Sequence, residues 1–356
     1  MKTIARMVLK PGMEIGEDVL NSRGEVIVPA HTIVDATIIS RLERHSVMAI
    51  SVMDEIDYAT THFEKVRLSQ SFKNFERLYL HLFPQYKEMM NNLVEKGTPV
   101  DTNILLQIYY ILTEKVVSGR QLLDFLYNMV PSEDELTHTH CMNSALIAGV
   151  FADWLGMKTS EKETLILCAY FYDIGKLKLP NSLLWKAGRL TDVEFARIKT
   201  HPFLGYEIVK DQDLDPHIFK SILMHHERCD GKGYPSRLKM QQIDFYARHI
   251  SIIDAYEAMT SPRSYRQSLT PLEVVERFED TGFMQYDLEI LKPIMSRIAD
   301  TQLGMTVKLS DDSIWEIFLP NQIRFSKPTL KREGKNGQLE LLDLMQRTDL
   351  KIVSIF

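Results

Sequence analysis

Hydrophobic and polar positions alternate between two patterns over residues 1–56. Residues 25–28 form a short β-branched run that predicts a strand, and Ile38, Ile39 and Leu42 follow helical spacing. Turn residues separate these patterns, at Pro11-Gly12, Gly16, Gly24 and Pro29. The pattern predicts a small β/α module without a cluster of metal ligands.

Residues 57–128 change to a helical period. Apolar side chains recur there at steps of three and four residues, as in Ile104, Leu105, Ile108, Leu112 and Val116. Pro84 and Gly97-Thr98-Pro99 predict breaks between separate helices. We expect a helical connector that can carry a dimer interface or relay a signal.

Residues 129–300 carry good signals for helix starts. Residues 132–135 resemble a capping box, and the polar stretches 159–163 and 190–194 predict two further helix starts. This part is therefore expected to be an all-helical domain.

Residues 301–356 return to strand patterns. Residues 305–309 and 313–318 flank Ser310-Asp311-Asp312 as in a hairpin, and residues 350–355 predict a final strand. The charged stretches 326–328 and 331–335 are expected to be solvated loops. The fold class is thus mainly α, with a small β/α module before the helical domain and a small β-rich module after it.

Composition narrows the classes of partner. The chain has 356 residues, 45% of them hydrophobic and 25% charged, with a net charge of −6 and a pI near 6.0. This balance argues against a nucleic-acid polymer or an anionic membrane surface as partner, since both require a basic surface. No run approaches the roughly 20 apolar residues of a membrane span, and three scattered cysteines fit a reducing compartment. We expect a cytoplasmic protein.

One stretch concentrates metal ligands and turn residues. It begins with His225-His226-Glu227-Arg228 and ends with Asp230-Gly231-Lys232-Gly233-Tyr234-Pro235. Adjacent histidines alone can be core residues held by hydrogen bonds, so the flanking segments must show whether this pair belongs to a metal site. Further His and Asp residues lie upstream and downstream, at His140, Asp173, His201 and Asp254. Imidazole and carboxylate donors suit Fe, Mn, Zn or Ni, and the set contains no thiolates.

These segments, with Asp173-Ile174-Gly175-Lys176 and Lys199-Thr200-His201-Pro202, resemble the HD-GYP branch of the HD metallohydrolases. The resemblance covers residues 129–295 and implies hydrolysis of cyclic di-GMP in bacterial second-messenger signalling. It implies divalent transition metals, expected to be two and with Fe or Mn favoured over Zn or Ni. It assigns metal ligation to His140, Asp173, His201, His225, His226 and Asp254. Asp173 is the expected bridge between the ions.

The same resemblance assigns substrate contacts. Lys176 is expected to neutralise charge on phosphate during catalysis, Tyr234 to contact the ligand, and Arg263 and Arg266 to hold phosphates or stack on guanine. A homodimer through the helical connector or the N-terminal module remains open.

The chain departs from the family at Tyr172, where the histidine of the HD pair is expected. A phenol with a reference pKa of about 10 binds metal less readily than a neutral imidazole. Water can replace the missing nitrogen, Tyr172 can ligate as phenolate, or one metal site can stay empty. The leading interpretation is a cyclic di-GMP phosphodiesterase. The alternatives are a non-catalytic cyclic di-GMP receptor and a hydrolase of another cyclic dinucleotide or phosphate ester.

Overall fold

A computed structural model describes the chain except residues 7–8, 22–23, 46, 54–60, 131–134, 185, 187, 262–267 and 335–336. The described chain divides into two compact units, Met1–Ser69 and Gln70–Phe356. No described helix is both long and apolar enough to cross a membrane.

The first unit is a small β/α unit. Strand β1 (Lys2–Ala5) pairs antiparallel with β4 (Ala49–Val52), and β2 (Val19–Leu20) pairs with β3 (Val26–Val28). Helix α1 (Ala36–Arg44) begins where the Asp35 side chain accepts a hydrogen bond from the Ile38 backbone, and α2 (His62–Leu68) begins with a capping box. Its core is apolar and contains Leu9, Ile15, Val28, Val34, Ile38, Leu42, Ile50 and Val52.

The second unit begins with one long helix, α3 (Gln70–Lys96), and the predicted break at Pro84 is wrong. Proline removes one backbone hydrogen bond from a helix, but α3 buries a continuous apolar stripe that outweighs this loss. The stripe consists of Phe72, Phe75, Tyr79, Phe83, Tyr86, Met90 and Leu93. Gly97, at φ +67°, ends the helix as predicted.

Helices of the second unit surround two buried central helices, α6 (Leu136–Trp154) and α7 (Thr159–Phe171). The predicted start signal at residues 132–135 falls mainly outside the described residues, while those near Thr159 and Thr191 are confirmed. The remaining helices are α4 (Thr102–Thr113), α5 (Gly119–Asn128), α8 (Asn181–Leu184), α9 (Asp192–Ile198), α10 (His201–Val209), α11 (Pro216–Met224), α12 (Phe245–Thr260), α13 (Pro271–Arg277) and α14 (Leu288–Asp300). Short 3₁₀ segments η4 (Ile174–Lys178) and η5 (Met240–Gln242) and a π turn η6 (Phe278–Gly282) lie between them.

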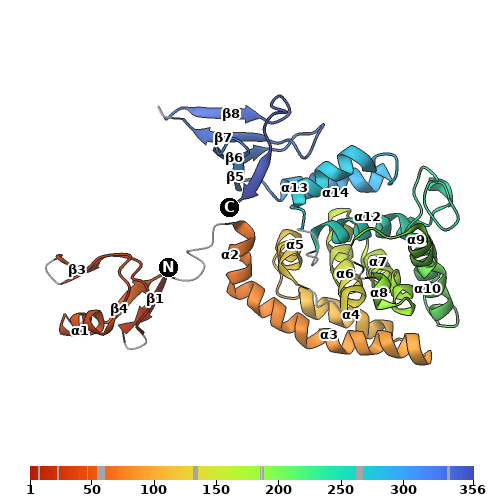
Figure 1. Ribbon diagram of the computed structural model, residues 1–356, viewed down its shortest axis with the longest axis horizontal. Helices are drawn as coiled ribbons and strands as arrows, with labels where there is room; N and C mark the ends of the chain where they lie inside the picture. Colours follow the sequence, from red (N-terminus) through yellow and green to blue (C-terminus); the bar gives the residue numbers. More distant parts are fainter. Residues whose placement is uncertain are drawn as a thin grey trace. The chain divides into compact units, whose positions relative to one another are not determined.

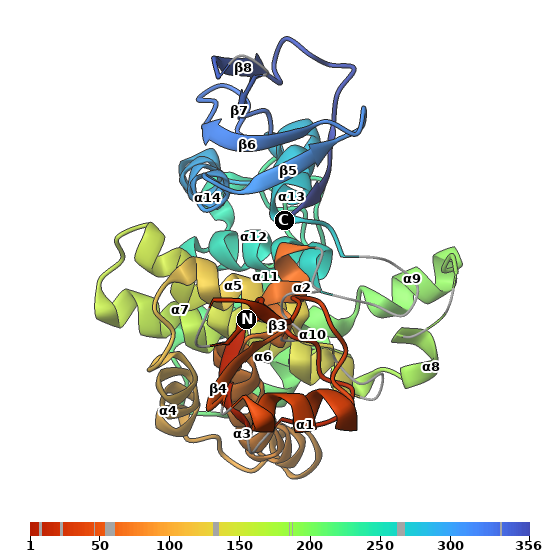
Figure 2. The same ribbon diagram turned by 90° about the vertical axis from the view of Figure 1, so that its left-hand side faces the viewer.

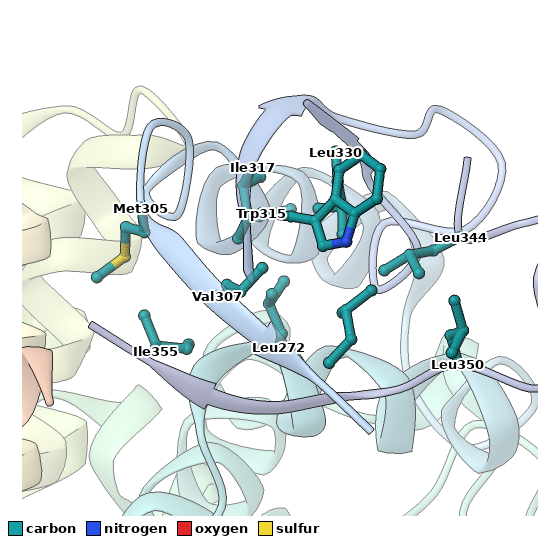
Figure 3. Close-up of a cluster of buried hydrophobic side chains, with 11 residues drawn as sticks. Leu272, Met305, Val307, Trp315, Ile317, Leu330, Leu344, Leu350 and Ile355 are labelled. Atoms are coloured by element: carbon teal, nitrogen blue, oxygen red, sulfur yellow. The ribbon is translucent and has the colours of Figure 1, made fainter. Parts of the chain in front are cut away.

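A five-stranded antiparallel sheet closes the chain, in the order β8-β7-β6-β5-β9. Its strands are β5 (Thr306–Leu309), β6 (Ile314–Leu319), β7 (Thr329–Glu333), β8 (Leu339–Asp343) and β9 (Ile352–Ile355). The sheet lies on the side of α13 and α14 that faces away from α12 (Figures 1 and 2). Leu272 of α13 and Ala299 of α14 join the apolar cluster beneath the sheet (Figure 3).

The hairpin and the final strand are confirmed, but the loop predicted over residues 331–335 is wrong. Lys331 and Arg332 belong to β7, where they pair with Glu316 and Glu340 on the neighbouring strands. Ser326, also predicted to be solvated, is buried and donates a hydrogen bond to Glu279. Cross-strand charge pairs and the buried Leu330 thus stabilise a strand in a charged stretch.

Candidate metal centre

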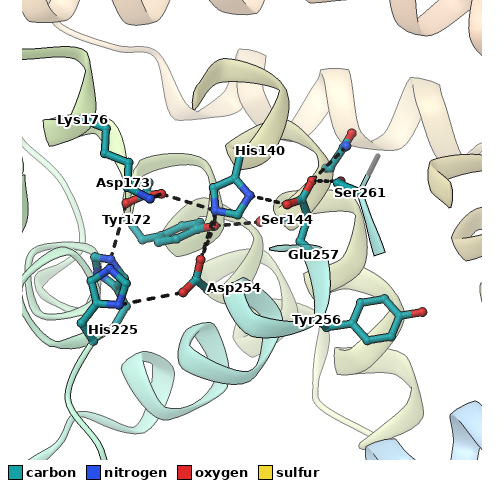
Figure 4. A network of polar contacts seen from close by, with 12 residues as sticks. His140, Ser144, Tyr172, Asp173, Lys176, His225, Asp254, Tyr256, Glu257 and Ser261 are labelled. Atoms are coloured by element: carbon teal, nitrogen blue, oxygen red, sulfur yellow. Dashed lines mark hydrogen bonds and ion pairs between the residues drawn. The ribbon is translucent and has the colours of Figure 1, made fainter. Parts of the chain in front are cut away.

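The six predicted metal ligands converge on one buried place in the helical domain, although they come from five separate segments. Figure 4 shows four of them, His140, Asp173, His225 and Asp254. His140 lies on α6, Asp173 follows α7, and Asp254 lies on α12. His201 is the first residue of α10, and His225 follows α11 directly. Five of these residues are less than 9% exposed, namely His140, Asp173, His201, His225 and Asp254.

The first donor group consists of Asp173, His201, His225 and His226. His201 Nδ1 faces the Ile198 carbonyl at 2.8 Å, and His225 Nδ1 faces the Ile222 carbonyl at 2.9 Å. Each Nδ1 therefore donates its hydrogen to a backbone carbonyl, which leaves a lone pair on each neutral Nε2.

Those two Nε2 atoms lie 3.1 Å apart, and Asp173 Oδ1 lies 3.2 Å from His201 Nε2 and 3.6 Å from His225 Nε2. Asp173 Oδ1 is buried and has no hydrogen-bond partner among the described residues. Two lone pairs and a carboxylate oxygen at this spacing repel one another unless a cation lies among them. The donors of this group therefore fit a metal ion.

The second donor group consists of His140, Asp173 and Asp254. His140 Nε2 lies 3.0 Å from Asp254 Oδ1 and 3.3 Å from Asp173 Oδ2. Burial disfavours a charged imidazole, but the carboxylates of Glu257, Asp173 and Asp254 outweigh it and raise the pKa of His140. The anionic surroundings of this group favour a cation there as well.

Asp173 belongs to both groups, and Lys176 neutralises part of its charge. Lys176 Nζ donates to Asp173 Oδ2 at 2.5 Å, three residues along the chain. Burial opposes ionisation of Asp173, yet Lys176 and the neighbouring histidines hold its pKa well below the usual range. The shared carboxylate is thus an anion with one oxygen toward each donor group.

Tyr172 points into the second group and is fully buried. Its hydroxyl lies 2.6 Å from His140 Nε2, 3.0 Å from Ser144 Oγ and 3.5 Å from Asp254 Oδ1. Burial and the carboxylates of Asp254 and Asp173 raise the pKa of Tyr172 well above 10.0. A neutral phenol therefore lies where the resemblance to HD-GYP domains predicts an imidazole.

A close approach of two backbones brings Asp173 and Lys176 to His201. A Cβ atom built on Gly175 would lie 2.0 Å from the His201 carbonyl oxygen and 2.5 Å from the Gly205 nitrogen. Only a glycine at this position lets η4 reach the first turn of α10.

The loop after the paired histidines packs equally closely. A Cβ atom on Gly233 would lie 2.5 Å from the His226 carbonyl oxygen, and the Tyr234 nitrogen donates to that same oxygen at 3.2 Å. The Tyr234 ring stacks on the His226 ring, with centroids 4.6 Å apart. Tyr234 thus lies beside the first donor group, while Arg263 and Arg266 lie outside the described residues.

Sequence reasoning missed the residues that support His140. Glu257 Oε2 pairs with His140 Nδ1, Asn143 Nδ2 donates to Glu257 Oε1 at 3.3 Å, and Tyr79 donates to Asn143 Oδ1 at 2.9 Å. Glu257 could have been found, because it follows Asp254 by three residues and so lies on the same face of a helix. Tyr79 and Asn143 carry no such signal.

Comparison with known proteins finds matches to the helical domain. A family model described as HD domain matches residues 124–290. The chain is 33% identical over 188 residues to "Cyclic di-GMP phosphodiesterase response regulator RpfG" of Xanthomonas campestris pv. campestris, covering 52% of this chain and 49% of the relative. It is 29% identical over 179 residues to "Cyclic di-GMP phosphodiesterase PA4108" of Pseudomonas aeruginosa, covering 50% of this chain and 43% of the relative.

The chain therefore spans about half the length of these curated relatives. Among solved structures, "Bd1817, a HDG"Y"P protein from Bdellovibrio bacteriovorus" superposes with a TM-score of 0.48 at 15% identity, over 82% of this chain and 97% of that one. Residues 124–290 are therefore similar to HD domains, and the relatives that this part of the chain resembles are named as cyclic di-GMP phosphodiesterases.

Proposed function

We propose that this protein is a metal-dependent phosphodiesterase that opens cyclic di-GMP to linear pGpG or GMP in bacterial second-messenger signalling. The observation that supports it most is Asp173, a buried carboxylate shared by two groups of nitrogen and oxygen donors. Two relatives named as cyclic di-GMP phosphodiesterases support the choice of substrate.

The proposed ligands are Asp173, His201, His225 and His226 for one ion and His140, Asp173 and Asp254 for a second. Mixed imidazole and carboxylate donors suit Fe or Mn, with Zn or Ni as alternatives. When bound, such ions supply Lewis-acid stabilisation of phosphate oxygens and lower the pKa of water.

The remaining roles belong to side chains around the donors. Lys176 is only partly covered, with 22% of its side chain exposed, so its ammonium group can meet a substrate phosphate beside Asp173. Tyr234 offers its ring next to His226 and would position the substrate rather than bind metal. Glu257 orients His140 through Nδ1 and so directs Nε2 toward Asp173 and Asp254.

The test is metal content measured together with turnover of cyclic di-GMP by the purified protein. We expect bound transition metal and slow but real cleavage after loading with Fe or Mn. Asp173→Ala should lose turnover and most of the metal, because both groups lose their shared anion. Lys176→Ala is the matched control, since it should lower turnover and leave metal content unchanged.

Two other results would replace the proposal. Tight binding of cyclic di-GMP without any cleavage would favour the receptor alternative, for which Tyr172 is the supporting feature. Cleavage of another cyclic dinucleotide in preference to cyclic di-GMP would change only the substrate. The domain boundaries at residues 56, 128 and 300, and a homodimer through the connector or the N-terminal module, stay predictions that light scattering and limited proteolysis can check.

A further inference from the structure

A pocket of about 560 Å³ lies beside the Gly-rich loop, within the size range of ligand pockets. Its lining contains three basic side chains, one aromatic ring and no carboxylate: Lys199, Gly231, Lys232, Gly233, Tyr234, Pro235 and Arg237. Such a lining suits an anionic ligand that carries an aromatic group.

The pocket adjoins the first donor group through Tyr234. One face of the Tyr234 ring stacks on His226, with an angle of 26° between the ring planes. Lys199 Nζ lies 5.3 Å from the centroid of the same ring. A ligand in this pocket would therefore lie one aromatic ring away from the metal donors.

Two of the three cations are available to an anion. Lys199 packs over the rings of Phe195 and Tyr234, and neither Lys199 nor Arg237 has a carboxylate partner among the described residues. Lys232 is peripheral, because its side chain is 81% exposed and lies 3.7 Å from Asp230 Oδ2.

The loop that carries Arg237 is fixed before any ligand binds. The carboxylate of Glu227, only 2% exposed, accepts hydrogen bonds from the backbone nitrogens of Ser236 at 2.6 Å and Leu238 at 2.9 Å. These bonds hold the residues on both sides of Arg237, whose φ of +55° is uncommon for a side-chain-bearing residue. Residues in such conformations cluster at ligand-binding sites, so the backbone of Arg237 makes this loop a candidate for ligand contact.

We propose that Lys199 and Arg237 bind the second phosphate of a cyclic dinucleotide while its first phosphate lies at the metal donors. The pocket then selects ligands with two phosphodiesters over those with one. This inference rests on the proposed function and names the part of the site that recognises a dinucleotide.

The experiment uses the full chain loaded with metal and the simple substrate bis(4-nitrophenyl) phosphate, which has one phosphodiester and no base. Cyclic di-GMP is added as a competing ligand, and its inhibition constant is measured for wild type, Lys199→Gln and Arg237→Gln. We expect each substitution to raise that constant about tenfold, equivalent to about 1.4 kcal/mol, and to change the KM of the simple substrate less than about twofold.

Matched controls separate a phosphate contact from a loss of charge or fold. Lys210→Gln removes a cation directly after α10, where Lys210 pairs with Glu207, and should leave both constants unchanged. Arg237→Lys keeps the charge and should restore part of the affinity. Thermal unfolding of each variant checks that the domain is intact.

An unchanged inhibition constant in both Gln variants would overturn the inference. An equal rise in the inhibition constant and in the KM of the simple substrate would also overturn it, because it would indicate general attraction of phosphate. Titration calorimetry with cyclic di-GMP gives the same comparison without turnover. Absent cleavage would then contradict the proposed function, while a tenfold loss of affinity in the variants would still support the pocket.

Discussion

Tyr172→His restores an imidazole beside the second donor group and should strengthen metal binding there. The Tyr172 hydroxyl lies 2.6 Å from His140 Nε2, so the side chain at this position already reaches the donors. To ligate as an anion at pH 7, a phenol with a pKa of at least 10 must lose a proton at a cost of about 4 kcal/mol. A histidine with a pKa near 6.5 is mostly neutral at pH 7, so its deprotonation costs almost no free energy.

Burial and the acidic neighbours of Tyr172 raise its pKa further, while a bound cation lowers it again. We therefore take about 4 kcal/mol, the cost at the reference pKa, as the order of the gain, which corresponds to about a thousandfold in affinity for the second ion. The first donor group does not include residue 172, so affinity for the first ion should stay the same.

The assay is a metal titration of the metal-free protein, with stoichiometry checked by elemental analysis. Tyr172→Phe removes the hydroxyl without adding a donor and should not tighten the second site. Tyr170→Phe is a matched control, because Tyr170 is equally buried and its hydroxyl has no hydrogen-bond partner among the described residues. Equal second-ion affinity in wild type and Tyr172→His would refute the reasoning.

Two further predictions concern the surroundings of the site. Glu257→Gln removes the charge that holds His140 Nδ1 and should weaken metal affinity about tenfold. Glu273→Gln on α13 is the control and should leave metal affinity unchanged. Equal metal affinities in the two variants would contradict the role of Glu257. Burial lowers the pKa of His249 from 6.5 to about 4, so the unfolded chain takes up this proton first as the pH falls. The free energy of unfolding should therefore fall by about 3 kcal/mol between pH 6.5 and 4 because of His249 alone. Thermal unfolding of His249→Gln over the same pH range should show a smaller loss of stability.

Local signals in the sequence were sufficient for most elements. Thr191 and Glu194 form a capping box at the start of α9 because both partners lie within four residues. Alternation around Ser310-Asp311-Asp312 predicted the β5–β6 hairpin for the same reason. The order and chemical type of the six ligands also come from the sequence, together with the departure at Tyr172.

Only the tertiary structure decided the features that depend on distant residues. Pro84 stays within α3 because packing along the whole helix outweighs one lost hydrogen bond, and the charged residues 331–333 form a strand because partners on β6 and β8 pair with them. Three features of the site depend on contacts between segments far apart in the chain. Asp173 is shared by two donor groups, Glu257 holds His140, and Lys199 lies beside Tyr234. No local period or spacing in the sequence predicts such contacts, because long-range packing determines which segments meet.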